Sequence, residues 1–392
     1  MNYLGLILFI LLLFIFIAWF TYEKQLINFK ISLKSDYPND IIILIMLTSI
    51  LYIFLLWEIN IIWIVFLLEF QSFIILGSYY LFKENKKKNS VKGIEGSINY
   101  IFPAFFSFFL MLMYILFNII NVNNDYIIEV IMNIILVLSI LTKMGAFPLF
   151  FWVSIVFQNI CYSTLLLISV VSKVFMITII LFYLSTIYSS FLFLGVFSIA
   201  ISSLFMLSFS NIKKFLAFSS IGNVGWILVL LSSNSTNKLI FNLNISEILI
   251  IFFFIYAFNF ILFCLIIKEN KNNHIFNITK NFLNGQQFIY ILVFTVVSLF
   301  SMAGIPPLLG FFGKYIIFIS YFNYNVISTL LLVFFSIVFI FCYIRPVTYL
   351  IRFNKPYDNI KSVYYFNKYI SNFIVFLVIF NFYLMFCIFY LY

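Results

Sequence analysis

The stretch Ser298-Leu-Phe-Ser-Met-Ala-Gly-Ile-Pro-Pro-Leu-Leu-Gly-Phe-Phe-Gly-Lys314 decides the fold, because it places helix breakers and a charge inside an apolar run. The run covers residues 287–320, which is longer than the roughly 20 helical residues that cross a bilayer core. It contains the breakers Gly304, Pro306, Pro307, Gly310 and Gly313. Proline leaves a carbonyl unpaired, which a membrane helix tolerates only where protein or water satisfies it. We predict a broken membrane helix with Lys314 in its second half.

The composition of the whole chain also indicates a membrane protein. Its 392 residues are 65% hydrophobic and 9% charged, whereas soluble domains carry about 25% charged residues. The mean hydropathy is +1.17. A soluble globule of this size would still expose about a quarter of its unfolded surface, so it could not hide this much apolar surface. We therefore predict an all-α polytopic membrane protein.

The apolar runs predict about twelve transmembrane helices, two of them broken. They cover residues 3–21, 41–57, 60–82, 97–120, 127–157, 162–187, 190–209, 212–231, 245–268, 287–320, 326–350 and 368–391. We expect a single membrane domain over residues 1–392. Its parts are a core at 41–350, an N-terminal helix and loop at 1–40, and a basic loop and C-terminal helix at 351–392.

The basic residues are distributed asymmetrically between the two predicted sides of the membrane. Of the 22 Lys and Arg residues, eighteen lie in or beside the loops of one side, and only Lys238 lies on the other. Such a split is what the positive-inside rule predicts for a correct helix count. The net charge of +10 is explained by these short loops, so we expect contact with membrane lipids and no nucleic-acid partner.

Several classes of cofactor site are disfavoured by the sequence. The cysteines Cys161, Cys264, Cys342 and Cys387 are isolated, with no C-x-x-C pair, which disfavours zinc and iron–sulfur sites. The chain has one histidine, His274, in a polar loop. No G-x-G-x-x-G or P-loop motif is present. We expect no metal and no cofactor in this chain.

Four charged residues lie deep inside predicted spans, far from the span ends: Glu69, Lys143, Lys173 and Lys314. A charge near the bilayer centre costs between about 2.5 and more than 10 kcal/mol, so each must face protein or water. Snorkelling reaches only a few ångströms from a helix end, whereas these residues lie about 12–20 Å from theirs at about 1.5 Å per residue. One glutamate neutralises one lysine, which leaves two lysines without an acidic partner at similar depth.

We interpret these charges as a proton relay. Burial and mutual repulsion disfavour the protonated form of lysine, so buried lysines can bind and release protons near neutral pH. If Glu69 pairs with Lys143, approach stabilises the protonated lysine and separation favours release. The structural alternative, in which the lysines are anchors or ion-pair partners, remains open.

The second long span, 127–157, is also interrupted, by Gly145 and Pro148, and it carries Lys143. Broken helices in matching places of two halves of a chain are typical of inverted-repeat transporters and their ion paths. The alternative, a packing kink, explains one proline better than a matched pair. We therefore expect antiporter-like inverted repeats.

Four segments together resemble a known family. They are the opening stretch 298–314, Thr142-Lys-Met-Gly-Ala-Phe-Pro-Leu-Phe-Phe-Trp152, Lys214-Phe-Leu-Ala-Phe-Ser-Ser-Ile-Gly-Asn-Val-Gly-Trp226 and Trp63-Ile-Val-Phe-Leu-Leu-Glu69. They resemble subunit 2 of proton-pumping NADH:ubiquinone oxidoreductase, respiratory complex I, a family of antiporter-like membrane subunits. The resemblance runs from about residue 41 to 350.

The resemblance implies a function and a setting. It implies that Glu69 pairs with Lys143, and that Lys173 links this pair to Lys314, which leads toward the proton outlet. It also implies that NADH, flavin, iron–sulfur clusters and ubiquinone are bound by other subunits, so that this chain moves protons without redox chemistry. The partners would be other membrane subunits of the complex, including neighbouring antiporter-like subunits. The location would be the mitochondrial inner membrane, with the basic loops facing the matrix.

The sequence departs from the family pattern in two respects. The glutamate falls on the third predicted span rather than the fifth, so two N-terminal helices are expected to be lost or carried by another polypeptide. Family members often have histidine at the positions of Phe150 and Asn223, so we expect water, Asn223 or serines to bridge the lysines. Two competing readings are a cation/proton antiporter subunit and a structural subunit with vestigial charges.

Overall fold

The computed structural model describes residue 48 and residues 61–81, 87–120, 126–183, 188–232, 245–268, 285–306, 308–322 and 326–352. The elements formed by these residues are helices, as the sequence predicts. The expected spans 3–21 and 368–391, and 41–57 apart from Thr48, lie outside the described residues. The chain divides into two compact units, Met1–Ser190 and Phe191–Tyr392. The expectation of a single membrane domain stays a prediction.

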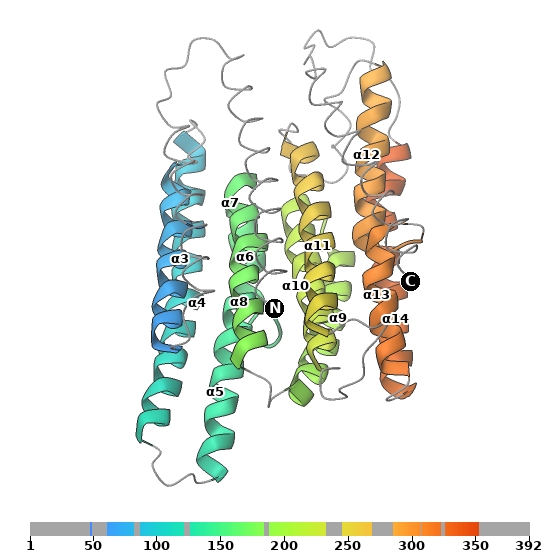
Figure 1. Ribbon diagram of the computed structural model, residues 1–392. Helices are drawn as coiled ribbons and strands as arrows, with labels where there is room; N and C mark the ends of the chain where they lie inside the picture. The colour runs from blue at the N-terminus through green and yellow to red at the C-terminus, as the bar shows by residue number, and fades with distance from the viewer. Residues whose placement is uncertain are drawn as a thin grey trace. The chain divides into compact units, whose positions relative to one another are not determined.

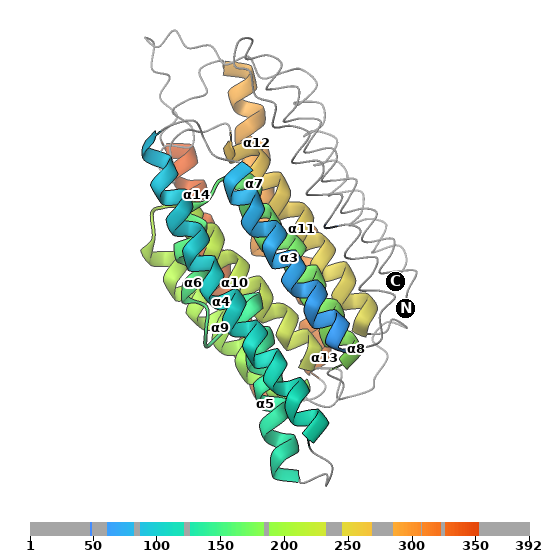
Figure 2. The same cartoon turned by 90° about the vertical axis from the view of Figure 1, so that its left-hand side faces the viewer.

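The first unit contains six α-helices and one π-helical turn among its described residues (Figure 1). They are α3 (Ile61–Leu81), α4 (Lys87–Ile120), α5 (Tyr126–Met144), α6 (Phe151–Asn159), α7 (Tyr162–Leu166), η1 (Leu167–Val171) and α8 (Ser172–Tyr183). Helix α4 packs against α3, α5 and α6, and α8 packs against α3 and α5. Figure 2 shows α4 and α5 running side by side. Helices α3 and α5 thereby reach the same interior, where their charged residues meet.

The second unit is built around one buried helix. Its described elements are α9 (Tyr188–Ser208), α10 (Ile212–Ser232), α11 (Ile245–Lys268), α12 (Gly285–Ala303), α13 (Leu309–Phe322) and α14 (Val326–Arg352). Helix α10 is buried along its whole apolar length. The Asn211 side chain starts α10 by accepting a hydrogen bond from the Lys213 amide at 3.0 Å.

Close packing against α10 depends on glycine. A Cβ atom at Gly195 of α9 would lie 2.8 Å from the carbonyl oxygen of Gly225, so any side chain there would push α9 away. Helix α14 continues the same packing, because a Cβ at Gly222 would overlap the ring of Phe339. Small residues at such crossings allow membrane helices to approach closely. The polar residues of α10 are consequently enclosed by protein.

The outward faces of both units are apolar. Among the described residues, five helical segments are long and apolar enough to cross a membrane, in α3, α4, α9, α10 and α14. Large side chains on these helices are exposed, such as Phe102 at 75% and Ile327 at 72%. Apolar surface of this extent is unfavourable in water and suits lipid or another membrane helix. The polytopic membrane fold predicted from composition is therefore present.

The structure differs from the predicted helix limits in two places. Helix α4 begins at Lys87, ten residues before the predicted start at residue 97. Hydropathy marks only the apolar part of a helix, and lysine and glutamate are good helix formers outside it. The predicted span 162–187 contains the π-helical turn η1. No proline or glycine marks this turn, so the sequence offered no signal for it.

Candidate functional site

The helix break after α5 is a glycine cap of a well-defined type. Gly145 has φ +70°, a left-handed conformation that costs a residue with a Cβ atom roughly 1–2 kcal/mol. The Gly145 amide donates to the Thr142 carbonyl at 3.3 Å, and the Ala146 amide donates to the Leu141 carbonyl at 3.0 Å. This pair of bonds is the Schellman motif, which satisfies two of the carbonyls left free at a helix end. The chain resumes as α6 at Phe151.

The break also has a side-chain donor. The indole Nε1 of Trp152 donates to the Thr142 carbonyl at 3.0 Å, and the Trp152 ring meets Tyr100 of α4 edge-on at 5.8 Å between centroids. A free carbonyl within a membrane is costly, so this indole stabilises the end of α5. Lys143 lies in the last turn of that helix, where the negative end of the helix dipole favours a cation.

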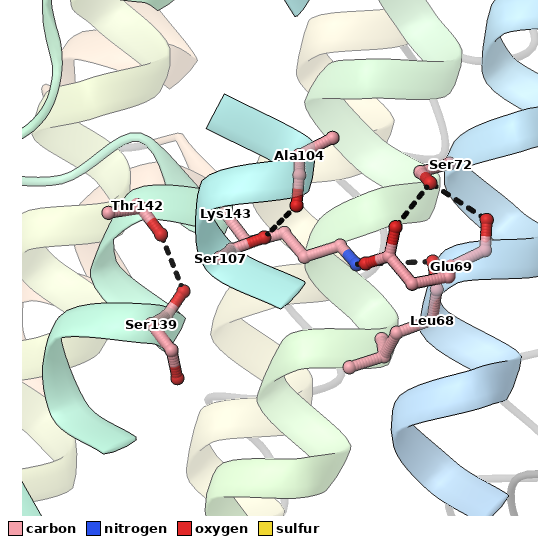
Figure 3. Close-up of polar contacts among 8 residues, drawn as sticks. All are labelled: Leu68, Glu69, Ser72, Ala104, Ser107, Ser139, Thr142 and Lys143. Atoms are coloured by element: carbon pink, nitrogen blue, oxygen red, sulfur yellow. Dashed lines mark hydrogen bonds and ion pairs between the residues drawn. The ribbon is translucent and has the colours of Figure 1, made fainter. Parts of the chain in front are cut away.

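Lys143 forms a buried ion pair with Glu69 of α3. Its Nζ lies 2.7 Å from Glu69 Oε1, and the two side chains are 5% and 9% exposed. The same ammonium group donates to the Leu68 carbonyl at 3.1 Å. Figure 3 shows the lysine reaching across from α5 to the carboxylate on α3, with Ser72 beyond it. The ammonium group is therefore held by one charged and one neutral acceptor.

The second carboxylate oxygen of Glu69 has its own neighbour. The Ser72 hydroxyl lies 3.1 Å from Glu69 Oε2 and 2.7 Å from the Glu69 carbonyl, and its single proton can serve one acceptor at a time. The hydroxyl can thus turn toward the carboxylate or away from it. A buried ion pair is stable only when its remaining lone pairs are also satisfied. Ser72 supplies that contact.

Lys173 lies in the first turn of α8, directly after the π-helical turn η1. It is 4% exposed, and α8 packs against both α3 and α5. Lys173 therefore belongs to the same helix cluster as Glu69 and Lys143. π-helical turns widen a helix locally and are frequent at functional sites.

The break between α12 and α13 repeats the first one. Gly304 has φ +81°, and its amide donates to the Ser301 carbonyl at 3.2 Å while the Ile305 amide donates to the Phe300 carbonyl at 3.1 Å. This is again the Schellman pair of bonds. A Cβ at Gly310 would overlap the Ser301 carbonyl, so α13 starts in close contact with the end of α12. The two broken helices predicted from the sequence thus use the same backbone device.

Lys314 turns back toward the end of α12. Its Nζ donates to the Ala303 carbonyl at 2.5 Å, and the residue is 3% exposed. The ammonium group lies 5.3 Å from the centroid of the Trp226 ring and 5.1 Å from that of Phe339. Ring faces attract cations. Within the described residues the structure records no ion pair for Lys314.

Several contacts of this site could not be read from the sequence. Ser72 lies one helical turn after Glu69, which is a weak signal. Trp152 and Trp226 belong to two of the family-like segments, but the sequence does not show what their rings contact. Phe339 gave no signal, because it reaches the site from another helix. Of the two positions expected to carry histidine in the family, Phe150 is buried and stacks on Phe151. Asn223 is buried on α10 and donates to the Ser219 carbonyl at 2.8 Å.

The described part of the chain contains no cluster of three or more His, Cys, Asp or Glu side chains able to hold a metal ion. The fold and the site instead define a polytopic helical membrane protein with buried charges at two broken helices. Residues 48–340 match the model of the NADH:quinone oxidoreductase/Mrp antiporter transmembrane family. The chain belongs to that family.

Curated relatives extend this result. The chain is 28% identical over 234 residues to NADH-ubiquinone oxidoreductase chain 2 of Anopheles gambiae, covering 59% of this chain and 64% of the relative. It is 27% identical over 267 residues to NADH-quinone oxidoreductase subunit N of Rickettsia conorii, covering 64% and 56%. The chain thus spans less than two thirds of either relative.

Solved structures share the fold. Respiratory complex I from Thermus thermophilus aligns with a TM-score of 0.70 at 16% identity, over 87% of this chain and 77% of that chain. The Mrp complex from Dietzia sp. aligns with a TM-score of 0.66 at 16% identity, over 80% and 60%. The antiporter-like fold expected from the sequence is confirmed.

Proposed function

We propose that this chain is a proton-translocating subunit in the membrane arm of an NADH:ubiquinone oxidoreductase, respiratory complex I. It carries no redox cofactor in this proposal, and NADH, flavin, iron–sulfur clusters and ubiquinone are bound by other subunits. Its partners are the other membrane subunits, including neighbouring antiporter-like ones, and membrane lipids. Its location is the mitochondrial inner membrane, with the basic loops facing the matrix. The family match and the curated relatives support this assignment.

The observation that carries the proposal is the buried Lys143–Glu69 pair at the end of a broken helix. Nζ and Oε1 lie 2.7 Å apart, and both side chains are enclosed by protein. Two charges held at this depth cost several kcal/mol of desolvation each, so a purely structural contact would be better made by apolar residues. An ion pair that opens and closes would explain why the charges are kept, because the closed pair favours the protonated lysine and the open pair favours the neutral lysine.

The mechanism follows from the contacts of the two side chains. When the carboxylate lies against the ammonium group, the protonated lysine is stabilised by the opposite charge. When the carboxylate moves away, the ammonium group keeps only the Leu68 carbonyl and gives its proton to a neighbouring base. The Ser72 hydroxyl can stabilise the separated carboxylate, since it already lies 3.1 Å from Oε2. Lys143 is then neutral and ready to bind the next proton.

Lys173 and Lys314 complete the proposed relay. Lys173 is the next buried base of the first unit, on a helix that packs against α3 and α5. Lys314 is a buried base of the second unit and is the end of the relay implied by the family resemblance. Within the first unit, the charge step at Lys143 changes the proton affinity of Lys173 through the low-dielectric interior. Quinone reduction elsewhere in the complex supplies the energy.

A second candidate is a cation/proton antiporter subunit. It is favoured by the structural similarity to the Mrp complex and by a family description that names both classes. The relatives from Anopheles gambiae and Rickettsia conorii, which match over more than half of this chain, are chain 2 and subunit N proteins of NADH oxidoreductases, which favours the first candidate. A structural subunit with vestigial charges is the third.

The test that separates the first two candidates is a native gel of detergent-solubilised membranes. The gel is stained for NADH dehydrogenase activity, and this chain is sought by mass spectrometry. We expect it in a large band whose activity is sensitive to quinone-site inhibitors. Migration as a smaller particle without NADH activity would contradict the proposal and favour the antiporter.

The vestigial-charge reading is tested by Lys173→Ala in the assembled complex. We expect fewer protons translocated per NADH oxidised in inside-out membrane vesicles, with electron transfer still measurable. Glu95→Ala is the control, because Glu95 is an exposed charged residue on α4 and is outside the proposed relay. Equal coupling in both variants would support vestigial charges.

A further inference from the structure

A line of polar residues runs along α10 from the neighbourhood of Lys314. Ser219, Asn223 and Trp226 recur at the spacing that places residues on one face of a helix. Trp226 is the residue whose ring lies 5.3 Å from the Lys314 ammonium group. This face of α10 leads from the neighbourhood of Lys314 toward the N-terminal end of the helix, where Lys213 and Lys214 lie. Ser219 is five residues, or about 7.5 Å, beyond Lys214.

Helix α14 faces this line with two aromatic side chains one turn apart. Phe339 lies 5.1 Å from the Lys314 ammonium group, and its ring lies 5.6 Å from that of Tyr343. Phe339 also fills the space beside Gly222, where a Cβ would overlap its ring. The Phe339 ring therefore neighbours the Lys314 ammonium group, the Tyr343 ring and Gly222 of α10.

The Tyr343 hydroxyl is fully buried and has no hydrogen bond of normal geometry among the described residues. The side chains of Ser219 and Asn223 lie beside it. The Trp226 Nε1, further along the same line, is also buried without a hydrogen-bond partner among the described residues. Buried polar atoms without protein partners are unusual, and the usual partner is an enclosed water molecule. Two such atoms on one line, next to a buried lysine, indicate a water-binding site.

We propose that Ser219, Asn223 and Tyr343 form a hydrated proton-input site for Lys314, gated by the ring of Phe339. This inference rests on the proposed function, and it assigns the side from which Lys314 is recharged: the end of the second unit that carries Lys213, Lys214 and Arg345. Arg345 donates to the Leu207 carbonyl at that end. Helix α10 is buried along its whole apolar length, so a proton that moves along this helix passes through an internal site.

The proton transfer balances at each step. A hydronium ion gives a proton to the Tyr343 oxygen on one side while the hydroxyl proton leaves on the other, so the hydroxyl is regenerated. Asn223 and Ser219 orient the water molecules and exchange no proton. The neutral Lys314 amine accepts the proton and becomes an ammonium ion. With the Phe339 ring in place the two sides are separated by an apolar constriction, which blocks water by dewetting. Rotation of the ring connects them.

The central test is Tyr343→Phe in the assembled complex in membrane vesicles, which removes only the hydroxyl. We expect the initial rate of proton translocation into sealed vesicles to fall about tenfold, since a positioned proton donor and acceptor is lost. The rate of NADH oxidation, measured after the membrane has been uncoupled, should be unchanged. The matched control is Tyr321→Phe. Its hydroxyl is also buried, but it is occupied by the Val229 carbonyl at 2.9 Å. Equal translocation in the two variants would overturn the inference.

Two smaller substitutions test the same site if Tyr343→Phe prevents assembly of the complex. Ser219→Ala and Ser220→Ala each remove a hydroxyl that donates to its own helix backbone, to Leu216 and Ala217 respectively. Ser220 points about 100° away from the line. We expect Ser219→Ala to slow translocation and to change its ratio in light and heavy water, with Ser220→Ala unchanged. No difference between the two serine variants would also overturn the inference.

The proposed gate, the Phe339 ring, is tested by Phe339→Ala. This variant should accelerate the decay of an imposed pH gradient across vesicles when no NADH is present; an unchanged decay would overturn the gate. Lys314→Met distinguishes failure of the proposed input site from failure of the proposed function. If it abolishes translocation while Tyr343→Phe does not, the input site is wrong and the proposed function stands. If Lys314→Met has no effect, the relay itself fails.

Discussion

The two breaks, at Gly145 and Gly304, share a backbone device and differ in how their lysine is held. At the first break the lysine belongs to the helix that ends, and its ammonium group binds a carboxylate from α3. At the second break the lysine belongs to the helix that begins, and its ammonium group binds the last carbonyl of the preceding helix. Both lysines sit at the negative end of a helix dipole, but only the first has a counter-charge among the described residues.

This difference predicts different consequences of losing a proton. A neutral Lys143 leaves the Glu69 carboxylate buried with only hydroxyl and backbone neighbours, which is costly. A neutral Lys314 leaves a carbonyl and two ring faces, and no buried charge. The first site therefore holds its proton until the pair opens, whereas the second responds mainly to its hydration. Loss of the lysine should therefore lower both stability and proton translocation at the first break, but mainly proton translocation at the second.

The largest effect is expected for Glu69→Ala, which leaves Lys143 as a buried cation without its partner. Removing one member of a buried pair costs about 3–5 kcal/mol, so the thermal stability of the complex and its proton translocation should both fall sharply. The measurement combines thermal denaturation of the solubilised complex with protons translocated per NADH oxidised in vesicles.

The control for this prediction is Glu95→Ala, which removes an exposed carboxylate from the neighbouring helix α4. The double variant Glu69→Ala with Lys143→Ala removes both charges and should recover part of the stability but none of the translocation. Losses that simply add in the double variant would show that the two residues are not coupled.

The second prediction compares Lys143→Met with Lys314→Met. The first leaves a buried carboxylate unpaired, and the second leaves no charge, so the stabilities should differ by about 3 kcal/mol. Both variants should lose proton translocation. Thermal denaturation and the same vesicle assay measure the two quantities. Equal stability of the two variants would mean that the carboxylate contributes little to holding the first break.

The sequence was sufficient for the positions of the breaks and the depth of the charges. Gly145 followed by Pro148, and Gly304 followed by Pro306, interrupt apolar runs in a way that allows few other structures. The depth of Lys143 and Glu69 follows from counting residues along a helix of known rise. These features are local, so they are readable without the tertiary structure.

The partners of the charges could not be read in the same way. Ala303 is the acceptor for Lys314 because α13 starts in close contact with the end of α12 at Gly310, and no local pattern encodes that contact. Phe339 reaches Lys314 from α14, the next helix along the chain. With 57 phenylalanines in the chain, the identity of any one contact is hidden. Inter-helix contacts depend on packing between remote segments, which periodicity does not specify.

The third prediction concerns the two glycines with positive φ. Alanine at either position costs about 1–2 kcal/mol from the left-handed backbone alone. A Cβ at Gly304 would lie 2.9 Å from Lys314 Cδ, so Gly304→Ala also displaces the lysine. At Gly145 it would instead overlap Val153. We expect similar losses of thermal stability in the two variants but a lower translocation ratio only in Gly304→Ala, measured in complexes matched for NADH oxidation. A lower ratio in both would show that α6 also sets the position of Lys143.

The smallest effect is expected for Trp152→Phe, which keeps an aromatic ring against Tyr100 but removes the indole donor to the Thr142 carbonyl. One hydrogen bond contributes about 1 kcal/mol, and the Schellman bond from Gly145 still serves the same carbonyl. The thermal midpoint of the complex should therefore fall slightly, with the translocation ratio unchanged. Among the described residues, the second break has no such indole donor. Its last carbonyl is bound by the Lys314 ammonium group instead, so the stability of this break depends on the protonation of the lysine. A clear loss of coupling in Trp152→Phe would mean that the first break also transmits changes at its carbonyls to its lysine, and the contrast between the two breaks would then disappear.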